Sequence, residues 1–140
     1  MLTETLNIAI AVFLLRTVTG ILFFFQGYDK LFNIKIGNVA RTINDSSEKL
    51  IIPFLIIKPA IALSSLLEMI CGGLLFFGLF KNIDLYLLTG NLIVVAFIFT
   101  SIKPMWDMQH YFPRIIFIVI LLVSTVAPDI FSFDYIFGIK

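Results

Sequence analysis

Four apolar stretches dominate the chain and limit what it can fold into. They run from about Leu6 to Tyr28, Pro59 to Phe80, Ile83 to Ile102 and Pro113 to Ala127. A helix that crosses a bilayer needs about 20 predominantly apolar residues, a length that all but the last stretch approach or reach. Because unpaired backbone groups are not tolerated in lipid, such stretches form helices. We therefore expect an all-α fold, an integral membrane four-helix transmembrane bundle.

Composition supports this class. Hydrophobic residues make up 60% of the 140 residues, charged residues 14%, and there are 16 phenylalanines. Mean hydropathy is +1.06. A soluble protein of this size could not bury so much apolar surface, so we expect a single transmembrane domain over residues 1–140 with lipid as its partner. The net charge of +1 gives no reason to expect nucleic acid.

The connections between the stretches are uneven. Lys81 to Asp84 is so short that it predicts an antiparallel hairpin. Residues 29–58 form a long loop, in which Ile36, Val39 and Ile43 have helical spacing and predict a short interfacial helix. The segment LIIPFLII, residues 50–57, is too short to span and predicts an interfacial or re-entrant piece. Four spans place both termini on one side, and the first run, which lacks a basic n-region, is expected to remain as a helix.

Positive charges favour one orientation. Seven lysines and arginines lie on the side of the long loop, whereas Lys81 and Lys140 lie on the side of the termini. The positive-inside rule then places the long loop in the cytoplasm. The seven are Lys30, Lys35, Arg41, Lys49, Lys58, Lys103 and Arg114.

Arg16 lies inside the first apolar run, where an unpaired guanidinium costs from ~3 to more than ~10 kcal/mol. Glu68 is the one acid within the second run. Counted from the long-loop side, Arg16 is about 18 Å deep and Glu68 about 14 Å deep at 1.5 Å per residue, and Asn91 of the third run lies at a similar level. We expect a buried Arg16–Glu68 pair with Asn91 beside it.

Two interpretations of this pair are open. Small residues accompany both charges, Gly20 near Arg16 and Gly72 near Glu68, and allow close helix packing. The pair could be a polar contact that fixes which helices pack together. Alternatively, it could belong to a quinone, proton or substrate site, because ionisable groups inside membranes are functional candidates.

A second candidate site lies on the long-loop side. Tyr28 and Lys30 follow the first helix, and Trp106, Asp107 and His110 join the third to the fourth. The aromatic residues also fit an interfacial belt, and a lone loop histidine is usually solvated. An imidazole beside a carboxylate at a lipid boundary could also accept a proton from a quinol. One histidine and one cysteine, Cys71, argue against a disulfide, a CxxC pair or a metal site within the chain.

A spaced pattern of charges and glycines runs through the first two helices. The first helix has Arg16, Gly20, Phe23, Gly27 and Lys30, and the second has Glu68, Gly72–Gly73 and Gly78. This pattern resembles the DoxX family of small bacterial membrane proteins. The resemblance implies a four-helix, multi-pass protein of the bacterial inner membrane. It also implies a link to membrane oxidoreductase assemblies, thiosulfate:quinone oxidoreductase among them, and to thiol or oxidative stress. The absence of a CxxC pair counts against thiol chemistry by this chain alone.

Three functions follow as hypotheses. The first is a subunit of a membrane oxidoreductase that contacts quinone through Arg16 and Glu68, with no cofactor within the chain and the redox centre in a partner subunit. The second is a non-catalytic scaffold or accessory subunit of a membrane or secretion complex. The third is a small transporter formed by a homo-oligomer, since four helices can hardly enclose a pore alone.

Overall fold

The computed structural model describes residues 2–46, 54–102, 108–124 and 129–138, and the regular elements in these ranges are helices. The all-α prediction is therefore confirmed for the described part of the chain. The elements are α1 (Leu2–Tyr28), the π-helical turn η1 (Asp29–Asn33), α2 (Ile36–Ser46), α3 (Phe54–Phe77), α4 (Lys81–Ile102), α5 (Met108–Val123) and α6 (Phe133–Phe137).

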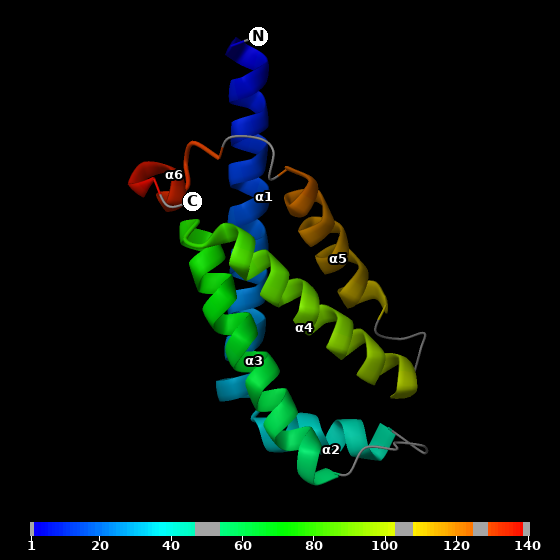
Figure 1. Ribbon diagram of the computed structural model, residues 1–140. Coiled ribbons are helices and arrows are strands. Elements are labelled where there is room, and N and C mark those ends of the chain that lie inside the picture. Colours follow the sequence, from blue (N-terminus) through cyan, green and yellow to red (C-terminus); the bar gives the residue numbers. More distant parts are fainter. Residues whose placement is uncertain (1, 47–53, 103–107, 125–128, 139–140) are drawn as a thin grey trace.

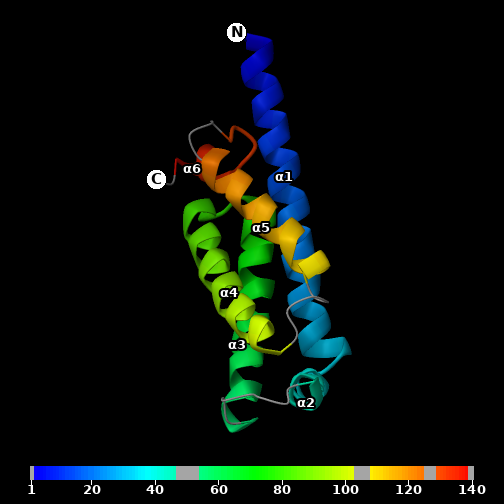
Figure 2. The same ribbon diagram turned by 90° about the vertical axis from the view of Figure 1, so that its right-hand side faces the viewer.

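Helices α1, α3, α4 and α5 lie side by side, and α2 runs across one end of the group (Figures 1 and 2). The start of α1 and the short helix α6 lie at the opposite end from α2 (Figure 1). The most extensive contact joins α1 to α3, and further contacts of α3 with α4, α4 with α5 and α5 with α1 close a ring. This ring surrounds a buried apolar core of Phe23, Cys71, Leu75, Leu85, Leu88, Leu92, Ile118 and Leu121.

The ends of the helices differ from the expected spans. Helix α3 begins at Phe54, five residues before Pro59, which lies inside the helix instead of starting it. Residues 54–57 are thus the first turn of α3 and no separate re-entrant piece, while residues 50–53 lie outside the described part. The first helix continues through η1, where the Ile34 N–H donates to the Asp29 carbonyl over 2.8 Å. Both helices therefore extend further toward the long-loop end than expected.

Two helices among the described residues are long and apolar enough to cross a membrane, Thr3–Asn33 and Ile56–Phe77. The apolar part of α5, Tyr111–Val123, is shorter. Large hydrophobic side chains also face outward on every helix of the ring, among them Phe25, Leu63, Phe97 and Val123, each more than half exposed. An apolar exterior of this extent suits a protein surrounded by lipid.

Glycines let α1 and α3 meet backbone to backbone. A Cβ added to Gly20 would lie 2.7 Å from the Phe76 nitrogen, and one added to Gly72 would lie 2.5 Å from the Phe24 nitrogen. Farther along, a Cβ on Gly27 would lie 2.5 Å from the Ser65 carbonyl oxygen. Small residues at such a crossing allow the close approach on which helix association in lipid depends.

The amphipathic segment expected from residue 36 is present as α2. Its Ala40 is fully buried, and it packs with Ile57 of α3 in a small apolar cluster. Polar residues Asn38, Arg41 and Thr42 are exposed. Helix α2 therefore has an apolar side that rests on the end of α3. That its other side faces the membrane surface stays a prediction.

Candidate functional site

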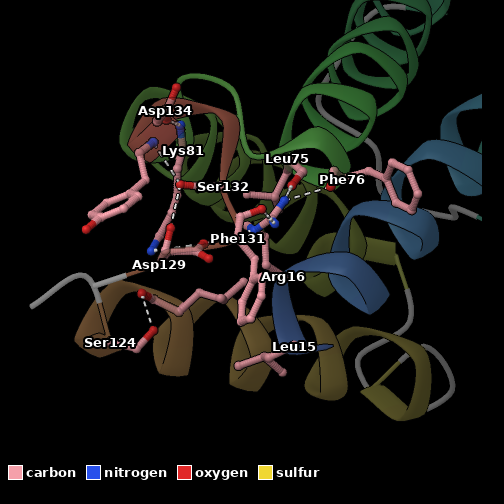
Figure 3. A network of polar contacts seen from close by, with 12 residues as sticks. Leu15, Arg16, Leu75, Phe76, Lys81, Ser124, Asp129, Phe131, Ser132 and Asp134 are labelled. Carbon is pink, nitrogen blue, oxygen red and sulfur yellow. Dashed lines mark hydrogen bonds and ion pairs between the residues drawn. The ribbon is translucent and has the colours of Figure 1, made fainter. Parts of the chain in front are cut away.

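The predicted Arg16–Glu68 pair is wrong, because each charge has a different partner. Arg16 is 1% exposed, and its Nε lies 3.0 Å from Oδ2 of Asp129, beyond the last predicted span. Its Nη1 donates to the carbonyls of Leu75 at 2.8 Å and Phe76 at 2.6 Å, and Nη2 donates to the Phe131 carbonyl at 3.3 Å (Figure 3). The guanidinium thus donates to two carbonyls in the last turn of α3, where helix carbonyls lack intrahelical donors.

The helix register explains the error. Gly20 lies against Gly72 and Phe76, and Gly27 lies against Ser65 and Met69. Arg16 is therefore level with the end of α3, and Glu68 lies about nine residues, or roughly 13 Å, along the pair of helices. The expected depths assumed that the two helices end at the same level, whereas Gly27, six residues before the end of η1, lies beside Ser65, eleven residues after the start of α3.

Asp129 also attracts a second cation. The Nζ of Lys81, at the start of α4, lies 3.7 Å from the same Oδ2. Burial lowers the pKa of the Lys81 ammonium, and the neighbouring Asp129 carboxylate opposes this shift. Asp134 accepts from the backbone N–H groups of Phe80 at 2.9 Å and Lys81 at 3.0 Å, which caps the first turn of α4.

These contacts close the turn between α3 and α4. Gly78 in this turn has φ +71°, and a Cβ there would lie 2.7 Å from Nη1 of Arg16. The Gly78 carbonyl accepts from the Asp134 N–H over 3.1 Å, and the Ser132 hydroxyl donates to the Asp129 carbonyl. We call Arg16, Lys81, Asp129, Ser132 and Asp134 the terminal-end cluster; it binds the 129–138 segment to the end of the bundle (Figure 3).

Glu68 lies in a second cluster, toward the other end of the bundle. It is 1% exposed, and both of its carboxylate oxygens are engaged. The Nζ of Lys30 donates to Oε2 over 2.7 Å, and Nδ2 of Asn91 donates to Oε1 over 3.1 Å. The predicted proximity of Glu68 and Asn91 is thus confirmed, with Lys30 in place of Arg16. We call Lys30, Glu68 and Asn91 the Glu68 cluster.

An open groove of about 400 Å³ lies beside this cluster, on the surface formed by α1, η1 and α5. Its walls include the apolar side chains Ile21, Leu22, Phe25 and Ile34, and its polar lining comes from Gln26, Asp29, Lys30 and Arg114. Lys30 belongs to both groove and cluster, since its side chain is 21% exposed while its ammonium contacts buried Glu68. The Gln26 Oε1 atom is buried without a hydrogen-bond partner.

The predicted loop-side site is only partly described. Tyr28 packs on Phe32, with ring centroids 4.8 Å apart, and is exposed at the outer surface, as an interfacial aromatic would be. Lys30 instead points to Glu68. Trp106 and Asp107 lie outside the described residues, as does the side chain of His110, so their predicted role stays a prediction.

Sequence reasoning missed Asp129, and it assigned no role to Gln26. Asp129 follows the last apolar stretch directly, and an acid at a helix end near an otherwise unpaired arginine was the available signal. Gln26 lies one residue before Gly27 and had no signal beyond its polarity in an apolar run. No group of three or more metal-ligating side chains occurs among the described residues.

Comparison with known proteins gives one result. A family model described as DoxX matches residues 11–101, well over half of the chain. The match includes Arg16, Lys30, Glu68 and Asn91 but ends before Asp129. Neither the curated proteins nor the solved structures contain a significant match to this chain.

Proposed function

The chain belongs to the DoxX family of membrane proteins, and from that premise we propose that it is a multi-pass subunit of the bacterial inner membrane that holds a quinone for a redox partner. In this proposal α1, α3, α4 and α5 span the membrane, and the long-loop end faces the cytoplasm, as the excess of positive charge there favours. The partner subunit carries the redox centre.

The observation that carries the proposal is the groove beside the Glu68 cluster. A volume of about 400 Å³ falls in the range of ligand sites, which are mostly apolar with a few placed polar groups. Ile21, Leu22, Phe25 and Ile34 offer an apolar surface for an isoprenoid chain. The groove is reached from the side of the bundle, so a ligand dissolved in lipid could enter it.

The polar lining fits both states of a quinone. The Lys30 ammonium can donate to a quinone carbonyl, and the partnerless Oε1 of Gln26 can accept from a quinol hydroxyl. Glu68 and Asn91 position Lys30 from behind. When quinol becomes quinone, its electron pair passes to the redox centre of the partner and its hydroxyl protons pass to water at the long-loop end. The side chains of this protein bind and orient the head group.

The test is native mass spectrometry of the protein extracted gently from its own membrane, with bound small molecules identified. We expect wild type to retain a quinone and Lys30→Gln to lose it by ~10-fold or more, because a hydrogen bond to a charged group contributes about 1.5–3 kcal/mol. Lys35→Gln, at an exposed position near η1, is the matched control and should retain quinone.

Gln26→Met provides a second variant that leaves the Lys30–Glu68 pair intact. It removes an acceptor that has no partner in the protein, so we expect weaker quinone retention with an unchanged fold. Quinone absent from wild type, or a phospholipid retained in its place and lost in the same variants, would contradict the proposal.

The terminal-end cluster favours a second candidate, a non-catalytic scaffold. It fixes a segment with outward-facing aromatic side chains, including Tyr135 at 61% and Phe137 at 67% exposed, to the end of the bundle. A partner protein that co-purifies with wild type and is lost with Phe137→Ser, without any bound quinone, would support this function over the first.

A further inference from the structure

Asp84 is a buried acid that neither cluster uses. It lies in the first turn of α4, is 1% exposed, and its Oδ2 has no hydrogen-bond partner. Leu85 and Leu88, which follow it in α4, are fully buried in the apolar core together with Leu121 of α5. A polar atom in such surroundings without a partner costs free energy, so its presence calls for an explanation.

Helix capping does not explain it. An acid in the first turn often caps the free N–H groups of its helix, but Asp134 already accepts from those of Phe80 and Lys81. A salt bridge does not explain it either. Among the described residues, the cations of this end, Arg16 and Lys81, both lie against Asp129.

Burial and a like charge act on the Asp84 carboxyl. The Cys71 thiol of α3, itself 3% exposed, lies beside it. The like charge is the Asp134 carboxylate of the 129–138 segment, which has the same sign as an ionised Asp84. Ile118 and Leu121 of α5 belong to the apolar core. A buried carboxyl without a cation partner avoids the cost of a buried charge by binding a proton.

A path to water exists at the terminal end. Lys81 precedes Asp84 by three residues and so lies on the same face of α4. The Lys81 side chain is 11% exposed and its ammonium contacts Asp129. A proton that leaves Asp84 thus has charged groups and the aqueous boundary one helical turn away, whereas Leu88 and Leu92 lie in the other direction along α4.

We propose that Asp84, beside Cys71 of α3, is a proton-binding site that exchanges with water at the terminal end of the bundle. Buried acids of membrane helices serve proton transfer in this way. The ligand is the proton itself, and the inference does not depend on what the groove binds.

Infrared spectroscopy of the protein in lipid bilayers tests the site, without added quinone. We expect a carbonyl-stretch band from a protonated carboxyl that shifts in D₂O and decreases as the pH is raised. Asp84→Asn should abolish this band. Glu68→Gln, which removes the other fully buried acid of the α3–α4 interface, should leave it in place.

Cys71→Ala keeps the test decisive if Asp84→Asn fails to fold. Loss of the neighbouring thiol should shift the carbonyl band without abolishing it. The proposal is overturned if the band persists in Asp84→Asn, if it is insensitive to D₂O, or if Cys71→Ala leaves its position unchanged. Quinone retention in these variants is measured separately, so failure of the groove and failure of the proton site are distinguishable.

Discussion

The two polar clusters of the bundle differ in whether their cation can reach water. Arg16 is 1% exposed, and its nitrogens contact three carbonyls and a carboxylate. Lys30 is 21% exposed, lines an open groove and makes one ion pair with Glu68. A guanidinium that cannot withdraw must keep its partners, whereas an ammonium on a flexible stem can move to the surface.

This difference separates a structural role from a binding role. The terminal-end cluster joins α1, α3, α4 and the 129–138 segment through buried contacts, and although Oδ1 of Asp129 has no hydrogen-bond partner, a ligand would have to break protein contacts to enter. At the Glu68 cluster a ligand could exchange contacts with Lys30 without exposing a buried guanidinium. The same sequence feature, a charge within an apolar helix, thus fits a structural role where the charge is buried and a binding role where a ligand can reach it.

Arg16→Met is expected to have the largest effect. It removes the guanidinium but leaves Asp129 buried and the Phe76 carbonyl without the side-chain donor that it has in the wild type. Breaking a buried ion pair costs about 3–5 kcal/mol, so the detergent-solubilised protein should unfold at a much lower temperature or fail to accumulate. The double variant Arg16→Met/Asp129→Leu should recover part of the loss. An Arg16→Met protein as stable as wild type would remove the structural role of the cluster.

Gly72→Ala should have the next largest effect, because the new Cβ would lie 2.5 Å from the Phe24 nitrogen of α1. Overpacking of this kind costs roughly 1–3 kcal/mol. Gly73→Ala is the matched control, since its Cβ would meet only the Phe24 ring at 3.5 Å. Thermal unfolding should separate the two neighbours. If both behave alike, backbone contact between α1 and α3 does not hold the clusters in register.

Glu68→Gln should affect ligand binding more than stability. The amide keeps an acceptor for Asn91, and Lys30 can turn toward water, so we expect a stability loss of about 1 kcal/mol or less. Quinone retention in native mass spectrometry should still fall by ~10-fold because Lys30 loses its fixed position. A loss of stability as large as that of Arg16→Met would make the two clusters equivalent and contradict the comparison.

The sequence predicts the helices well and their contacts less well. Apolar length located α1, α3, α4 and α5, and the spacing from Ile36 located α2, because each signal is local. The register of α1 on α3 is not local. It depends on which glycine meets which backbone, and the expected register placed Arg16 near Glu68 instead of beside the end of α3.

The site shows the same limit. Glu68 and Asn91 were expected together because α3 and α4 are joined by a short turn, which fixes their relative level. Asp129 could not be paired with Arg16 in this way, since it is 113 positions later in the chain and folds back over the end of α3. Side chains whose partner comes from a distant segment need the assembled bundle before they can be paired.

Asn91→Ala should have the smallest effect on quinone retention, and it separates the contribution of Asn91 to the Glu68 cluster from that of Lys30. Asn91 contributes one hydrogen bond of 3.1 Å to Oε1 of Glu68, and removal of such a bond costs about 0.5–1.5 kcal/mol. The Lys30–Glu68 pair should persist, so quinone retention should fall by less than in Glu68→Gln. Thermal unfolding and quinone retention, each measured on Asn91→Ala and Glu68→Gln, show which variant has the larger effect. If Asn91→Ala releases quinone as completely as Glu68→Gln, then Asn91 fixes the carboxylate that Lys30 needs, and the binding role extends from the groove into the α3–α4 interface.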